Sequence, residues 1–121
     1  MVKVRLSDER VQESPRVVAV RIHGDVDSSN CHAVEEYFDA VLEREQPRHV
    51  LLDLGGVTYG ASAFFSSLLF WREELTKRGG KLVLFALRPE VLSTMRILAL
   101  DRVLTVKPDR AAALAGLPLD P

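Results

Sequence analysis

The chain has 121 residues, a size typical of one domain, and 47% of them are apolar, which is enough for a core without covalent cross-links. A net charge of −1 gives no basic field for nucleic acid or an acidic membrane, and the single cysteine, Cys31, excludes an intrachain disulfide. No apolar run approaches the roughly 20 residues that span a bilayer, and the N-terminus lacks the apolar core of a signal peptide. We therefore expect residues 1–121 to form one soluble, cytoplasmic domain.

The N-terminal part of the sequence predicts two strands. Val2, Val4 and Leu6 alternate with charged residues, which is the pattern of a half-exposed strand at a sheet edge. Residues 7–15 are polar and end in a Ser-Pro pair, so they predict a turn segment. Residues 16–22 are a continuous run rich in β-branched side chains, as expected of a strand covered on both faces.

Downstream, segments with helical periodicity alternate with apolar runs typical of buried strands. Ser28 or Ser29 is expected to cap the first helix, and Gly79-Gly80 to end the second. The order β-β-α-β-α-β-α-β-α predicts an α/β fold, with helices packed on a mixed, mostly parallel sheet and an antiparallel N-terminal edge strand. The expected helices span residues 30–46, 62–78 and 88–100, with a last helix after Pro108-Asp109, and the expected strands span residues 49–54, 81–87 and 102–106.

Three groups of residues resemble catalytic or ligand-binding sites. Two of them lack an essential residue, and the third has a more common structural explanation. Residues 55–62 have the glycine spacing of a phosphate-binding loop but lack its lysine. Ser62 has the position of the nucleophile in G-x-S-x-G, but Phe64 replaces the second glycine. Asp25 and Asp27 lie near a histidine and could meet a cation, although aspartates in turns more often bond to their own backbone. We therefore expect no catalytic residue, cofactor or metal.

A receiver-type phosphoacceptor domain is the enzyme-like alternative. Asp8-Glu9 would supply its acidic pair, Asp53 at the end of a buried strand its phosphoacceptor, and Lys107 with the next proline its Lys-Pro. Two features argue against it, because the acidic pair leads into another strand and Phe85 and its neighbour replace the hydroxyl residue of the fourth strand. Asp53 is then expected to form a cap or turn.

Four segments in this order carry a family resemblance: RVVAVRIHGDVDSSN, HVLLDLGGVTYGASAFFSSLLF, RGGKLVLFALRPEV and ALDRVLTVKPD. Their best markers are a Gly24-x-x-Asp27 turn, the D-L-x-x-V-T-Y strand exit and Gly79-Gly80. Over nearly its whole length the chain resembles the STAS domains of anti-sigma-factor antagonists. The resemblance implies a non-enzymatic domain that binds a GHKL-type serine kinase doubling as an anti-sigma factor. The kinase reverses this binding by phosphorylating a D-S-[ST]-G-[LI] turn at the start of the second helix.

That phosphorylation motif is degenerate here. Aligned without a gap on D-L-x-x-V-T-Y, the family's Asp falls on Ala61, its first serine on Ser62, its phosphoacceptor on Ala63, and its Gly and Leu on Phe64 and Phe65. Because alanine has no hydroxyl, the resemblance implies that the usual switch is absent. Ser62 remains the candidate phosphorylation site, since a helix N-terminus favours an added charge of about −2. The alternative, which we expect, is that Ser62 is the N-cap of the helix.

Apolar residues on polar helix faces are the remaining signal. Phe70 falls among charged residues, and Ile97 and Leu100 leave the stripe that includes Met95 and Leu98. If Phe70 and Ile97 lie close together, they form a patch for a partner. The expected partner-binding residues are Asp27, Asn30, Thr58, Tyr59, Ala61, Ser62, Ala63, Phe64 and Phe70.

Two functional hypotheses follow from the resemblance. In the first, the chain is a constitutively active antagonist that binds a kinase or anti-sigma factor. In the second, it is a non-switching subunit of a larger STAS assembly or of a transport-associated complex, with another STAS protein or a second copy of itself as partner.

Overall fold

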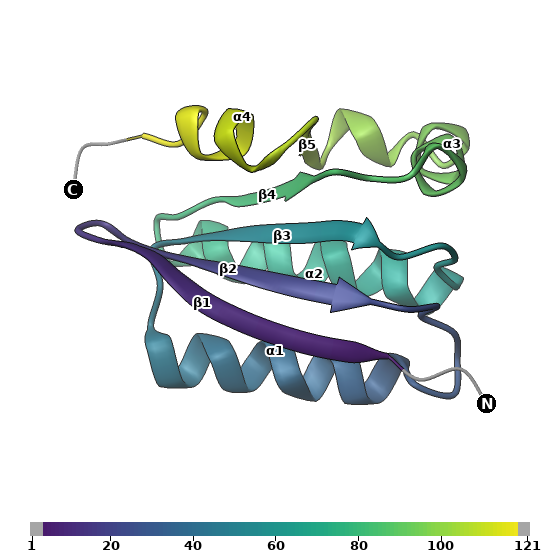
Figure 1. Ribbon diagram of the computed structural model, residues 1–121, viewed down its shortest axis with the longest axis horizontal. Helices are drawn as coiled ribbons and strands as arrows, with labels where there is room; N and C mark the ends of the chain where they lie inside the picture. The colour runs from purple at the N-terminus through teal and green to yellow at the C-terminus, as the bar shows by residue number, and fades with distance from the viewer. Residues whose placement is uncertain (1–3, 119–121) are drawn as a thin grey trace.

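The computed structural model describes residues 4–118 and contains a five-stranded sheet with helices on both faces (Figure 1). In spatial order the strands are β1 (Arg5–Glu13), β2 (Arg16–His23), β3 (His49–Gly56), β4 (Leu82–Phe85) and β5 (Thr105–Lys107). The helices are α1 (Cys31–Glu45), α2 (Ser62–Lys77), α3 (Pro89–Ile97) and α4 (Arg110–Ala115), and a 3₁₀ turn, η1 (Leu100–Arg102), precedes β5. β1 is antiparallel to β2 and the other pairs are parallel, so the predicted fold class is confirmed.

Two apolar layers enclose the sheet, one on each face. Successive side chains of a strand point to opposite faces. Val18 and Val20 of β2 therefore belong to the larger layer, which α1, α2 and α3 cover, whereas Val17 and Ala19 belong to the smaller layer, which α4 covers. Figure 1 accordingly shows α1 and α4 at opposite sides of the view, with the strands between them. Burial on both faces explains why the strand sequences are apolar without interruption.

Three aromatic side chains join α1 to α2 beneath the sheet. Phe38 of α1 stacks on Trp71 of α2 with 4.1 Å between the ring centroids. Phe64 meets Trp71 edge-on, with 6.5 Å between centroids. Each of the three side chains is at most 1% exposed. Such pairs contribute about 0.5–1.5 kcal/mol beyond the burial of their area, so this cluster fixes how the two helices pack.

The first strand differs from its prediction. The sequence predicted a strand from Val2 to Leu6 followed by a polar turn segment over residues 7–15. Val2 lies outside the described residues, and β1 extends over Arg5–Glu13, so that only Ser14-Pro15 forms the hairpin turn. The prediction was wrong because pairing with β2 satisfies the backbone of this polar segment, and polar side chains of an edge strand need no apolar environment.

Polar contacts hold β1 against α1. Tyr37 donates its hydroxyl hydrogen to Asp8, and Arg44 Nη2 lies 2.6 Å from Asp8 Oδ1. Glu45 accepts hydrogen bonds from Arg44 Nε at 2.8 Å and from Arg10 Nε at 2.5 Å. The two arginines lower the pKa of Glu45 to about 2, while burial and the bond to Asp8 raise the pKa of Tyr37 to about 12. Asp8 and Arg10 of β1 thus form an ion-pair network with Arg44 and Glu45 of α1.

The pH dependence of stability tests this network. The carboxyl group of Glu45 has an ordinary pKa of 4.5 and a folded-state pKa of about 2, so between these values the unfolded chain binds more protons. Wild-type stability is therefore expected to fall as the pH drops from about 4.5 toward 2. Glu45→Gln is expected to be less stable at neutral pH and to lose less over that window. Urea denaturation across the window measures both effects.

The control variant is Glu43→Gln, which removes an exposed carboxylate from the same helix. It is expected to reproduce the wild-type pH profile. Identical profiles for Glu45→Gln and the wild type would show that the arginine contacts do not depress the pKa of Glu45.

The glycine pair after α2 is confirmed as a helix terminator. Gly79 has φ of +77°, in the left-handed region that favours glycine. Gly80 lies so close to the loop between α1 and β3 that an added Cβ would stand 1.6 Å from the carbonyl oxygen of Arg48.

None of the helices within the described residues is long and apolar enough to cross a bilayer.

Two other element boundaries differ from expectation. The helix predicted over residues 88–100 ends at Ile97, because η1 occupies Leu100–Arg102 after a left-handed residue at Ala99. The strand predicted over residues 102–106 is displaced to Thr105–Lys107 for the same reason.

Candidate partner-binding surface

The β2–α1 loop and the β3–α2 turn lie side by side at the carboxyl ends of β2 and β3. The N–H of Val26 donates to the carbonyl of Tyr59 at 2.9 Å, and the N–H of Ala61 donates to the carbonyl of Val26 at 2.8 Å. The Thr58 hydroxyl donates to the carboxylate of Asp25. A parallel bridge pairs Val26 with the residue before Ala61. The two loops therefore present one continuous surface.

Asp27 and Asn30 organise the first of these loops. Asp27 Oδ1 accepts hydrogen bonds from the N–H of Ser29 at 2.8 Å and from that of Asn30 at 3.2 Å. Asn30 Oδ1 accepts from the N–H of Asp27 at 3.0 Å, and Asn30 Nδ2 donates to the carbonyl of Asp25 at 2.8 Å. The hydroxyl and backbone N–H of Ser29 keep the pKa of Asp27 below its usual value.

These contacts bear on two predictions, the residue that caps α1 and the candidate cation site at the aspartates. The residue that caps α1 is Asn30, not Ser28 or Ser29, because the Asp27 carboxylate already binds the N–H groups of this turn. The Asp27 carboxylate bonds within its own loop and the Asp25 carboxylate accepts from Thr58. Among residues 4–118 no three His, Cys, Asp or Glu side chains are grouped to hold a metal ion.

The second helix begins at Ser62, as expected, but the residue that caps it differs from the prediction. Its N-cap is Ala61, whose carbonyl accepts hydrogen bonds from Phe64 N at 2.9 Å and Phe65 N at 3.3 Å. Ser62 is therefore the first helical residue, and the prediction that it caps the helix was wrong. The physical reason is that the bond from Ala61 to the neighbouring loop fixes where the chain enters the helix. The side chains of Ser62 and Ala63 are exposed.

The structure divides the predicted partner-binding residues into three groups. Phe64 is fully buried against Trp71, so its side chain belongs to the core and is not accessible to a partner. Phe70 is 57% exposed, but it lies eight residues beyond Ser62, about 12 Å along the helix axis, in a hollow between α1 and α2. The other seven residues lie together and are called the turn surface below: Asp27, Asn30, Thr58, Tyr59, Ala61, Ser62 and Ala63.

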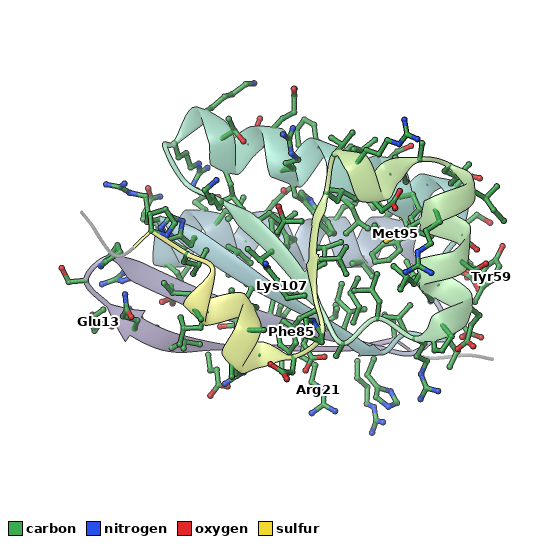
Figure 2. The ribbon with its side chains drawn as sticks, turned by 90° about the horizontal axis from the view of Figure 1, so that it is seen from above. Glu13, Arg21, Tyr59, Phe85, Met95 and Lys107 are labelled. Atoms are coloured by element: carbon green, nitrogen blue, oxygen red, sulfur yellow. The ribbon has the colours of Figure 1, made fainter. Side chains whose placement is uncertain are left out.

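The sequence did not predict that α3 lies beside the turn surface and contributes to the same face. A hollow of about 370 Å³ beside the turn surface is lined by Tyr59, Ser62 and Phe65 together with Glu90 and Leu98 of α3 and its end. Figure 2 shows Tyr59 beside α3, at the opposite end of the molecule from Glu13. No local pattern in the sequence indicates which turn this helix packs against.

The apolar residues at the end of α3 are also redistributed. Leu98, expected in the buried stripe, is 51% exposed, whereas Leu100 packs against the main core. The stripe fails here because the α-helix has already ended. Ile97 is 81% exposed as expected, but it is Leu98 that lines the hollow beside the turn surface, and Phe70 lines a different hollow.

The arrangement required for a receiver site does not form. Asp8 and Glu9 are consecutive strand residues and point to opposite faces, toward α1 and toward an arginine of α4. Asp53 accepts a hydrogen bond from Gly55 N at 2.9 Å, which is the turn-forming role expected of it. Lys107 is the last residue of β5, at the far side of the sheet from β1.

Comparison with known proteins shows which family shares this sequence. A protein-family model described as the STAS domain matches residues 10–113. The chain belongs to the STAS domain family. Over 95 residues it is also 32% identical to the Bordetella bronchiseptica protein BtrV, provisionally described as an anti-sigma factor antagonist, and the match covers 78% of this chain and 81% of BtrV.

Solved structures share the fold of this STAS domain. An anti-sigma factor antagonist from Mycobacterium paratuberculosis superimposes with a TM-score of 0.78, covering 93% of this chain and 94% of that chain at 22% identity. A Thermotoga maritima protein described as a candidate anti-sigma factor antagonist superimposes with a TM-score of 0.76, covering 91% and 92% at 16% identity. At these identities the similarity concerns the fold.

Proposed function

We propose that this STAS domain is a non-enzymatic regulatory protein that acts in the cytoplasm as an anti-sigma factor antagonist. Its turn surface binds an anti-sigma factor of the serine-kinase type. Binding is constitutive, because position 63 carries no hydroxyl group for the kinase to phosphorylate.

The observation that carries this proposal is the environment of Ala63. Its methyl group is exposed at the first turn of α2, next to Ser62 and within the turn surface. In the family the phosphoacceptor occupies the corresponding place, where an added phosphate would lie at the helix N-terminus and change the charge of the docking surface by about −2. A methyl group cannot accept a phosphoryl group, so the charge at this position stays unchanged in the presence of the kinase.

The neighbouring serines differ in how well they could replace the missing acceptor. Ser67 is buried, and Glu35 Oε2 and the carbonyl oxygen of Ala63, each 3.0 Å from its Oγ, share its one hydroxyl hydrogen, so a kinase has no access to it. Ser66 is exposed but lies a turn further along the helix. Ser62 is exposed and does not cap the helix, so it is the acceptor that the experiment must test.

The experiment combines co-purification with intact-mass analysis. The tagged chain is recovered from its native host, and the proteins bound to it are identified. The kinase recovered in this way is then incubated with ATP and either the wild type or Ala63→Ser. We expect an anti-sigma factor in the complex, one added phosphoryl group on Ala63→Ser and none on the wild type.

Each other outcome contradicts a separate part of the proposal. Phosphorylation of the wild type that Ser62→Ala abolishes would show that the switch has moved by one residue, although docking would remain. Recovery of other STAS proteins without an anti-sigma factor would favour a non-switching subunit of a larger assembly.

A further inference from the structure

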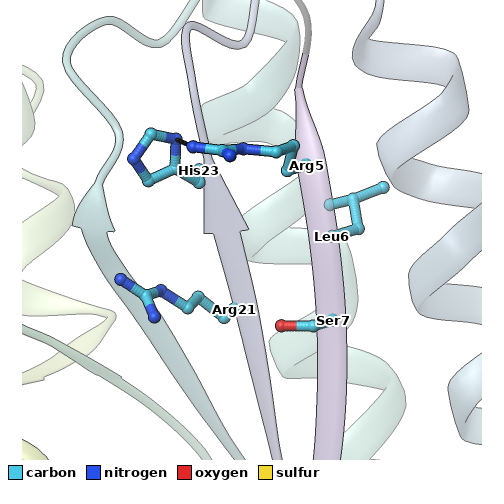
Figure 3. A pocket seen from close by; sticks show the side chains of 5 residues that line it. All are labelled: Arg5, Leu6, Ser7, Arg21 and His23. Carbon is cyan, nitrogen blue, oxygen red and sulfur yellow. Dashed lines mark hydrogen bonds between the residues drawn. The ribbon is translucent and has the colours of Figure 1, made fainter.

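A hollow of about 300 Å³ lies between β1 and β2, on the sheet face that carries α4 but outside the area that α4 covers. Its lining includes Arg5 and Ser7 of β1 and Arg21 and His23 of β2. In the strand register Arg5 lies opposite His23, and Ser7 lies opposite Arg21. Figure 3 shows these four side chains on one side of the two strands. The hollow therefore gathers polar groups from adjacent strands at the end of the sheet.

The positive charges of this hollow are poorly compensated. Among residues 4–118 no carboxylate forms an ion pair with Arg5, and Arg21 has only Asp53, with 3.9 Å between Nε and Oδ2. Glu9, which lines the adjoining hollow, is already paired with Arg110 at 2.6 Å. Arg5 and Arg21 are diagonal cross-strand neighbours, about 7–8 Å apart at the backbone, where like charges repel. An anion between them would remove this repulsion.

The polar groups of the hollow are also arranged as donors. Arg5 Nη2 donates to His23 Nδ1 at 3.2 Å, because a guanidinium has no acceptor. The proton of the neutral imidazole is then on Nε2, which is a second donor. The Ser7 hydroxyl and the Arg21 guanidinium, whose side chain is 62% exposed, complete the set. A ligand that only accepts hydrogen bonds suits these groups.

We propose that this hollow binds the phosphate group of a small phosphate-containing molecule. A tetrahedral phosphate offers several acceptor oxygens, and arginine binds it with two parallel hydrogen bonds. No Phe, Tyr or Trp ring on which a base could stack lines the hollow, so the recognised part is the phosphate itself. This inference is independent of the proposed function of the turn surface.

The hollow is connected to the β2–α1 loop. His23 is the last residue of β2, and the N–H of the next residue, Gly24, donates to the carbonyl of Gly56 at 2.9 Å. Gly56 itself packs so closely on the imidazole that an added Cβ would lie 2.4 Å from His23 Cδ2. A phosphate bound in the hollow would therefore contact His23, the strand residue that immediately precedes this loop.

Titration of the full chain with sodium pyrophosphate, followed by the backbone amide resonances of β1 and β2, tests the proposal. We expect saturable shifts around Arg5 and Arg21 with a Kd of about 1 mM, and similar but weaker shifts with inorganic phosphate. Arg21→Gln is expected to weaken binding about tenfold, since a charge-assisted contact is lost. Because this side chain is exposed, the variant is expected to fold, and circular dichroism checks that the fold is kept.

The matched control is Arg96→Gln, which removes an exposed arginine from the last turn of α3. This variant is expected to bind pyrophosphate like the wild type. Shifts that never saturate, shifts reproduced by sodium chloride at the same ionic strength, or equal weakening in the two variants would each overturn the proposal.

Discussion

Replacing Trp71 with alanine is expected to lower the free energy of unfolding by about 3–5 kcal/mol. The side chain is 1% exposed and contacts the rings of both Phe38 and Phe64, so its removal leaves a cavity between α1 and α2 that their backbones cannot close. Urea denaturation followed by circular dichroism measures the change, because Trp71 is the only tryptophan and its fluorescence is lost in the variant.

Trp71→Phe keeps an aromatic ring in the same place and is expected to cost clearly less than alanine. This second variant remains informative if Trp71→Ala does not fold. A loss of less than about 1 kcal/mol in Trp71→Ala would mean that the stacked cluster does not fix the packing of the helices.

Tyr59→Ala is expected to weaken the proposed complex with an anti-sigma factor about thirtyfold or more. Tyr59 is 54% exposed, belongs to the turn surface and also lines the hollow beside α3, so a partner can bury its ring. Aromatic residues at the centre of an interface commonly contribute 2 kcal/mol or more on truncation, which corresponds to about this factor in Kd. Calorimetry with the purified partner measures the loss.

Phe70→Ala is the matched control for this experiment. Phe70 is exposed to a similar extent, 57%, and comes from the same stretch of sequence, but it faces a different hollow about 12 Å away along α2. Binding is expected to be unchanged. If Phe70→Ala weakened the complex as much as Tyr59→Ala, the docking surface would have to include the groove between α1 and α2.

The order of elements could be predicted because buried strands and amphipathic helices have different periodicities. Residues 16–22, 49–54 and 62–78 carry these patterns clearly, and the structure follows them within a few residues. β1 could not be predicted in full, because the residues that face α1 in it are charged. Their role depends on Arg44 and Glu45, which are distant in the sequence.

The site was predictable to the extent that it follows from topology. The carboxyl ends of parallel strands share one edge, which is why the Asp27 loop and the turn at Tyr59 lie together. Details that depend on tertiary contacts could not be predicted from the sequence. The position of Ser62 in the helix depends on the backbone hydrogen bond that Ala61 donates to Val26, and the exposure of Leu98 depends on where α3 ends.

The backbone bonds that join Val26 to the turn at Tyr59 have a consequence for recognition. Ordering a flexible residue costs about 1–2 kcal/mol of conformational entropy, and a docking loop that is disordered before association incurs this cost in the bound state. Here the two loops are already tied together through a residue that is 0% exposed. Affinity is therefore coupled to the integrity of the interior, and substitutions beneath the loops can change association without touching the partner.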